Sequence, residues 1–193
     1  MPLYHFSEDA TIERFVPRPP LAHPEWEPLV WAIDSWHQPI YWVPRDCPRV
    51  CFWPLPTTTP EDRERYEATT AARMVVTIEA AWLERLRATT LYRYTMPEAS
   101  FESLHDHGAH VSRAEVVPLG VVLLDDLLAR FAAADVELRI SPSLVPLARS
   151  LQQTSLHWSL IRMRNAQGWE GPPPQGPAMG HPRLQPKGDA AAR

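Results

Sequence analysis

The distribution of glycine is the feature that most constrains what this chain can fold into. The 193 residues contain 7 glycines, and only Gly108 and Gly120 precede residue 166. The other five lie close to the C-terminal end: Gly168, Gly171, Gly176, Gly180 and Gly188. Dinucleotide-binding and P-loop folds need several glycines within a few residues, because their backbone N–H groups must close around phosphates. The sequence therefore argues against both kinds of glycine-rich phosphate loop.

The same distribution separates a folding region from a tail. Hydrophobic residues make up 45% of the chain, which is enough to bury a sizeable core. Apolar periodicity stops after residue 166, where glycine and proline dominate and the entropy of ordering could not be repaid. We expect a single α+β domain over residues 1–166 and a disordered Gly/Pro-rich tail over residues 167–193.

Charge and cysteine content restrict the partners and the compartment. A net charge of −4 argues against an extended nucleic-acid surface, which requires a clustered cationic excess. No run approaches the roughly 18 apolar residues of a membrane span. The opening MPLYHFSED lacks the pattern of a secretion signal. Two cysteines, Cys47 and Cys51, argue against a disulfide scaffold, so we expect a cytoplasmic protein with no membrane partner.

Hydrophobic patterning predicts short strands interspersed with helices. Strands are expected at residues 3–6, 29–33, 49–53, 73–78, 91–94, 110–112, 116–123 and 136–140. Helices are expected after Ser7, after Asp34, from Pro60 with Thr59 as N-cap, and over residues 80–87, 124–131, 144–151 and 156–163. The order lacks the regular βαβ alternation of a doubly wound parallel sheet. Two small sheets with peripheral helices fit it better.

A histidine near two aromatic positions is the first candidate for chemistry. His5 lies on the first expected strand, Trp31 lies on the second, and Tyr41 follows ten residues later. The imidazole could bond a ribose hydroxyl while Trp31 and Tyr41 sandwich a planar ring. The alternative is a satisfied core histidine surrounded by packing aromatics.

These residues resemble the ADP-ribosyltransferase fold of the His–Tyr–Glu type. The segment Tyr4-His5-Phe6-Ser7 is similar to its aromatic-His-Gly-Thr/Ser strand, with Phe6 in place of the glycine. Trp31-Ala32 followed by Tyr41 is similar to its second strand and helix, with Trp31 in place of a tyrosine. The resemblance implies a split β-sheet core with peripheral helices. It also implies NAD as substrate, held by His5, Ser7, Trp31 and Tyr41. The chain as a whole also resembles a family of uncharacterised bacterial proteins.

A glutamate on a later strand is the third element that the resemblance implies. It would bond the 2′-hydroxyl of the nicotinamide ribose and stabilise the oxocarbenium-like state as nicotinamide leaves. Glu115, at the beginning of the strand expected from residue 116, is the preferred candidate, and Glu79 is its rival. Either could instead be a solvated surface carboxylate. His5 and Glu115 are therefore the expected catalytic residues.

Two arginines that each directly follow a proline are the second candidate. In Pro44-Arg45-Asp46-Cys47-Pro48-Arg49, two guanidinium groups could grip a diphosphate in bidentate fashion. Arg45 is accordingly an expected cofactor-binding residue. The alternative is that Asp46 ties both arginines into a structural turn.

The third candidate is the histidine-rich segment 105–110. Its three histidines and one aspartate could bind zinc, but Gly108 marks a turn and such surface loops often bind metal adventitiously, so we expect no functional metal. Together these residues predict an NAD-binding protein that transfers ADP-ribose from NAD to an acceptor. The alternative is a non-catalytic module on the same scaffold that binds a nucleotide-type small molecule or another partner.

Overall fold

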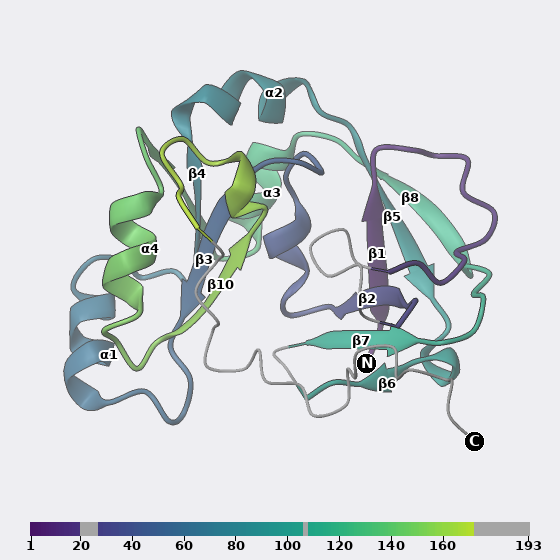
Figure 1. Ribbon diagram of the computed structural model, residues 1–193, viewed down its shortest axis with the longest axis horizontal. Coiled ribbons are helices and arrows are strands. Elements are labelled where there is room, and N and C mark those ends of the chain that lie inside the picture. The colour runs from purple at the N-terminus through teal and green to yellow at the C-terminus, as the bar shows by residue number, and fades with distance from the viewer. Residues whose placement is uncertain (20–26, 106–107, 172–193) are drawn as a thin grey trace. The chain divides into compact units, whose positions relative to one another are not determined.

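The computed structural model describes residues 1–19, 27–105 and 108–171 and confirms a mixed α+β fold with two β-sheets (Figure 1). The chain forms two compact units, each built around one sheet. The six-stranded unit comprises residues 1–38 and 91–124, and the four-stranded unit comprises residues 39–90 and the described residues from 125 onward. Residues 172–193, where most of the expected disordered tail falls, lie outside the described residues.

The six-stranded unit is an antiparallel sheet in the order β6-β7-β2-β1-β5-β8. Its strands are β1 (Leu3–Ser7), β2 (Val30–Asp34), β5 (Leu91–Met96), β6 (Glu102–Ser103), β7 (Ala109–Ser112) and β8 (Gly120–Leu124), with the 3-10 turn η3 (Glu98–Ser100) after β5. Figure 1 shows β1 among β2, β5 and β8. The N-terminal strand is thus one of the two central strands of its sheet.

One face of this sheet is covered by the segment that follows β1. Phe15 packs there with Leu3, Val30 and Tyr94. The Tyr94 hydroxyl donates to the Asp9 carbonyl at 2.7 Å and accepts from the Ile12 N–H at 3.2 Å. The expected helical turn after Ser7 is wrong, because these contacts and a bridge from Phe15 to Val116 hold the segment extended.

The four-stranded unit has the strand order β10-β3-β4-β9, in which β4 and β9 are parallel and the other pairs are antiparallel. Its strands are β3 (Arg49–Trp53), β4 (Met74–Glu79), β9 (Val136–Ser141) and β10 (His157–Ile161). Its helices are α1 (Pro60–Glu67), α2 (Leu83–Ala88), α3 (Leu127–Ala133) and α4 (Val145–Leu151). Its 3-10 turns are η1 (Gln38–Tyr41), η2 (Ala80–Trp82) and η4 (Met163–Asn165). The first residue of η1, Gln38, belongs to the six-stranded unit.

Helices α1 and α4 cover one face of the four-stranded sheet. Tyr66 of α1 and Leu151 of α4 pack against Val50, Val75 and Trp158 in one buried cluster. Figure 1 shows the two helices on the same side of β3, β4 and β10. Because side chains alternate along a strand, Arg49 and Cys51 on β3 project from the opposite face.

Strand β10 replaces the helix expected over residues 156–163. Its residues pair with β3 from His157 opposite Trp53 to Ile161 opposite Arg49. Leu156, Trp158 and Leu160 contact the core at every second position, which is the period of a strand. The residues at 156, 160 and 163 also match helical spacing, so periodicity in this short segment fits both structures. Pairing with the otherwise free edge of β3 stabilises the strand, so the segment forms β10 and not a helix.

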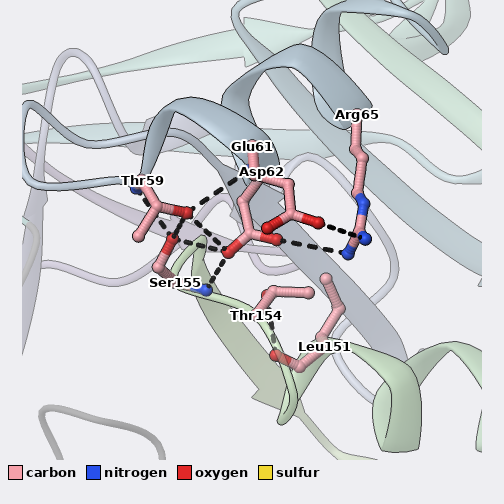
Figure 2. Close-up of polar contacts among 7 residues, drawn as sticks. All are labelled: Thr59, Glu61, Asp62, Arg65, Leu151, Thr154 and Ser155. Atoms are coloured by element: carbon pink, nitrogen blue, oxygen red, sulfur yellow. Dashed lines mark hydrogen bonds and ion pairs between the residues drawn. The ribbon is translucent and has the colours of Figure 1, made fainter.

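A buried carboxylate fixes the beginning of α1 to the turn before β10 (Figure 2). Thr59 is the N-cap, as the sequence predicts, and its hydroxyl accepts the Asp62 N–H. Asp62 accepts from the Ser155 N–H at 2.7 Å and from the Ser155 hydroxyl at 2.6 Å. The Ser155 hydroxyl oxygen in turn accepts the Thr59 N–H at 2.9 Å. An aspartate inside the first helical turn also suits the helix dipole.

Among the described residues, no helix combines the length and the apolar character needed to cross a bilayer.

Asp62→Asn should lower the melting temperature at neutral pH, because a neutral amide oxygen accepts the two hydrogen bonds from Ser155 more weakly than the carboxylate does. The hydrogen bonds from Ser155 hold the Asp62 pKa below its ordinary value. The stabilisation is therefore present above the unfolded pKa of about 3.9 and is lost as the pH falls through the folded pKa. The melting temperatures of the variant and the wild type should therefore converge as the pH falls below about 3.9 and through the folded pKa.

Glu61→Gln is the matched control, because its partner Arg65 is exposed and such pairs contribute little. An Asp62→Asn difference that persists unchanged into acid would contradict a role for the carboxylate charge.

Candidate functional site

The two units divide the residues that the sequence singled out. His5, Ser7, Trp31 and Glu115 belong to the six-stranded unit, whereas Tyr41 and Arg45 belong to the four-stranded unit. Each group is described within its own unit.

His5 is held in place on β1 by the backbone of the neighbouring strand. Its Nδ1 lies 2.8 Å from the Trp31 carbonyl oxygen, and its ring lies 4.6 Å from the Phe15 ring. Phe15 belongs to the core cluster on one face of the sheet. The Trp31 side chain packs with Leu29 and Val111 in a separate cluster, and Trp31 lies between two residues, Val30 and Ala32, that face the Phe15 cluster. Since side chains alternate along β2, the His5 and Trp31 side chains project from opposite faces.

Glu115 lies one residue before the bridge that joins Phe15 to Val116. Its carboxylate forms an ion pair with Arg14, and both side chains are substantially exposed. Phe15 and Val116 face the core, so Glu115 meets Arg14 on the other side of this bridge. The structure does not bring Glu115 to the His5 ring. Ser7 ends β1 and accepts the Asp9 N–H at 3.1 Å.

A carboxylate–imidazole pair that sequence reasoning missed lies at the end of β2. Asp34 is 5% exposed, and its carboxylate lies 2.9 Å from the His37 Nδ1 and 2.8 Å from the His37 backbone N. Burial pushes the Asp34 pKa upward, but the hydrogen bonds from His37 outweigh burial, so the pKa lies below its ordinary value. Gly108 closes against both residues, and its carbonyl accepts the Asp34 N–H at 3.0 Å. The D-x-x-H spacing after an expected strand was the available signal.

Arg49, at the beginning of β3, is the central residue of a second group. It is only 3% exposed, and its guanidinium donates to the carbonyls of Ile40 at 2.9 Å and Cys47 at 3.0 Å. Its guanidinium carbon lies 5.2 Å from the centre of the Tyr41 ring. None of the ion pairs found among the described residues includes Arg49. A buried cation is thus satisfied by carbonyl dipoles and an aromatic face.

Two hydrogen bonds join the Arg45 loop to the residues after β10. The Arg162 Nε donates to the Arg45 carbonyl at 3.3 Å, and the Asn165 amide donates to the Asp46 carbonyl at 2.7 Å. The register pairs Arg49 with Ile161, which directly precedes Arg162. Arg45, Arg49, Arg162 and the neighbouring Arg164, together with Tyr41, are called the arginine cluster below.

The arginine cluster carries an excess of positive charge. Burial lowers the pKa of the Arg162 guanidinium, and the charges of Arg164, Arg49 and Arg45 lower it further, whereas Asp46 acts in the opposite direction. Burial likewise lowers the pKa of Arg49. The charges of these guanidinium groups act on one another, which makes the region a suitable environment for an anion.

Glu79, the rival catalytic candidate, projects from the other face of the same sheet. It is 3% exposed at the end of β4, where its two carboxylate oxygens accept the Gln167 N–H at 2.9 and 3.2 Å. Val75 faces α1 and α4, so alternation along β4 places Glu79 on that face, opposite the face from which Arg49 projects. Glu79 instead anchors the backbone that follows η4.

The backbone of Arg162 is also unusual. Its φ of +56° lies in the left-handed region, which costs a non-glycine residue roughly 1 kcal/mol or more. Sequence reasoning missed Arg162 because it lay in a segment expected to be helical. Residues held in this region concentrate at functional positions, where the surrounding structure imposes the conformation.

The remaining candidates do not form a metal site within the described residues. No group of three or more His, Cys, Asp or Glu side chains is arranged to hold a metal among residues 1–19, 27–105 and 108–171. Asp106 and His107 of the histidine-rich segment lie outside the described residues. Cys47 and Cys51 are free and buried, and burial raises the pKa of each thiol to about 12, so both are protonated at neutral pH.

Gly108→Ala tests the junction with Asp34 and His37. An added Cβ would lie 2.3 Å from the His37 Nδ1 and 2.6 Å from Asp34 Oδ2, and the φ of +87° disfavours any side chain. We expect a loss of roughly 2–4 kcal/mol in the free energy of unfolding, measured with denaturant. Gly120→Ala is the control, because its added Cβ meets nothing within 4 Å. Equal stability of the two variants would contradict the close packing of Gly108 against Asp34 and His37.

Comparison with known proteins adds a family but no activity. Neither the curated proteins nor the solved structures gave a match, so the resemblance to the ADP-ribosyltransferase fold is not confirmed. The sequence profile of a family described as a family of unknown function, DUF6886, matches residues 4–166. This match spans both units and most of the chain. The protein therefore belongs to the DUF6886 family, a family of unknown function.

Proposed function

We propose that this protein binds a nucleotide-type small molecule through the arginine cluster of the four-stranded unit, and that NAD is the first ligand to test. The single observation that carries the proposal is the buried Arg49 guanidinium, which has no carboxylate partner among the described residues and lies beside Arg162. An anion would be stabilised by this charge.

A diphosphate fits the chemistry of the cluster better than a metal or an apolar ligand does. Guanidinium groups bond phosphate oxygens in bidentate fashion, and such charge-assisted bonds are about twice as strong as neutral ones. Two of the cluster's arginines, Arg45 and Arg164, lie in exposed positions, and Arg162 is half-buried. These side chains can therefore meet a ligand, while Arg49 contributes a fixed charge behind them.

The aromatic ring of Tyr41 gives the cluster a second type of contact. The ring is 36% exposed and stacks near the Arg49 guanidinium. A nucleotide combines a planar base with phosphates, and aromatic faces and guanidinium groups are the usual partners of these two parts. This combination supports the sequence-based expectation for Tyr41 and Arg45.

Transfer of ADP-ribose from NAD is the further activity that the family resemblance implies. One observation favours it: the hydrogen bond to the Trp31 carbonyl fixes the orientation of the His5 imidazole on a central strand. In this proposal His5 bonds a ribose hydroxyl and Glu115 supports the developing positive charge. The opposite projections of the His5 and Trp31 side chains, and the pairing of Glu115 with Arg14, favour the binding function over transfer.

Arg162→Gly is the sharpest test of binding. Glycine tolerates a φ of +56°, and the relief of this backbone strain offsets the lost hydrogen bond to the Arg45 carbonyl, so the variant should keep its fold while losing one guanidinium. Losing a charge-assisted hydrogen bond costs about 1.5–3 kcal/mol, so the Kd for NAD should rise roughly 10- to 150-fold. Isothermal titration calorimetry with NAD and ADP-ribose measures this change.

Arg149→Ala is the charge-matched control, because Arg149 lies exposed on α4. It should leave the Kd unchanged. Nicotinamide riboside, which lacks the diphosphate, should bind much more weakly than NAD. The proposal of binding through the arginine cluster would be rejected if NAD, ADP-ribose and ADP all failed to bind. It would also be rejected if the wild type and Arg162→Gly had equal Kd values.

Release of nicotinamide from NAD distinguishes transfer from binding alone. If the protein is a transferase, Glu115→Gln should abolish nicotinamide release and leave the Kd for NAD within a factor of about two. A wild type that binds NAD but releases no nicotinamide would reject transfer and leave the binding function intact.

A further inference from the structure

The free edge of the six-stranded sheet is unusually apolar. Strand β8 is the last strand in its order and pairs with β5 alone among the described strands. Side chains on both of its faces are about half exposed, with Val121 at 46%, Val122 at 48% and Leu123 at 48%. Two residues just before the strand are more exposed still, Val117 at 56% and Leu119 at 71%.

This edge lacks the protection that edge strands normally carry. Natural sheets block unwanted pairing with charged side chains, prolines or bulges along the edge. From Val116 to Leu124 the sequence contains no charged residue, and its one proline, Pro118, lies outside the strand. An uncharged edge strand with apolar side chains on both faces is a template for pairing with another strand.

The other end of the same sheet is protected. Strand β6 has only two residues, and its Glu102 is paired with Arg113, which also bonds Glu27. In the four-stranded unit, the edge strand β9 carries the ion pair between Glu137 and Arg139. Pairing of β8 with either strand of a second copy would place these charges against apolar side chains. Head-to-tail association through β6 or β9 is therefore disfavoured.

We propose that β8 is a dimerisation strand, which pairs antiparallel with β8 of a second copy of this chain to form one continuous sheet. A twofold axis brings the same uncharged apolar surface together from both copies, so the interface is self-complementary. When fully covered in both copies, these five exposed apolar side chains and the strand backbone supply roughly 1,000 Å² in total, which reaches the lower limit for a specific interface. The inference is independent of the nucleotide site, because it rests on other residues.

Two substitutions on β8 test the proposed dimer, so the test does not depend on the correct folding of a single variant. Val122→Lys introduces a charge in the middle of the strand, as natural edge strands do. Gly120→Glu introduces a charge where an added Cβ meets nothing within 4 Å, so the fold accommodates it. Ile140→Lys is the control, because Ile140 is 40% exposed on the edge strand β9 of the other sheet.

Sedimentation equilibrium of the full chain measures the outcome. At ~100 μM the wild type and Ile140→Lys should have the mass of a dimer, while Val122→Lys and Gly120→Glu should be monomers or dissociate at least tenfold more readily. A monomeric wild type would overturn the proposal and indicate that another segment or partner covers β8. Dimers of unchanged stability in both β8 variants would also overturn it, because another surface would then hold the copies together.

Discussion

The burial of the Arg49 guanidinium is the constraint on which the arrangement of the four-stranded unit's candidate site depends. A cation in a low-dielectric interior is costly unless its N–H groups are satisfied. Arg49 meets this requirement with the carbonyls of Ile40 and Cys47, so the chain between η1 and β3 must fold back over the guanidinium. That path brings Tyr41 against the guanidinium and sets Arg45 on a loop held by Arg162. The position of these side chains therefore follows from the need to satisfy a buried cation.

Strand alternation has an equally strong effect in the six-stranded unit. A strand exposes its side chains to both faces, so two residues in neighbouring strands share a ligand only when their register places them on the same side. The His5 Nδ1 contacts the backbone carbonyl of Trp31, but the Trp31 side chain lies on the other face of the sheet. Val30 and Ala32 are the residues of β2 whose side chains lie on the His5 face. A motif read from spacing along each strand does not contain this information. Only the pairing between strands supplies it.

Much of the fold could be predicted from local sequence. The boundaries of β3 and the N-cap at Thr59 follow from prolines, aromatic residues and an acidic first turn. The two failures share a cause: the segment after Ser7 and the segment of β10 are each short, and each has a pattern that fits more than one conformation. Contacts distant in sequence decided them, namely Tyr94 with the Asp9 carbonyl and β10 with the free edge of β3.

The sequence by itself determined the composition of the fold and several of the groups available for chemistry. It established an α+β chain with a glycine-poor folded region, which argues against a glycine-rich phosphate loop. Only the tertiary structure decided which of those side chains meet. Arg162 joins the Arg45 loop, and Gly108 closes over the local pair of Asp34 and His37, because strand register and backbone conformation brought these segments together. Local propensity acts over a few residues, whereas hydrogen bonding and burial act between segments more than a hundred residues apart.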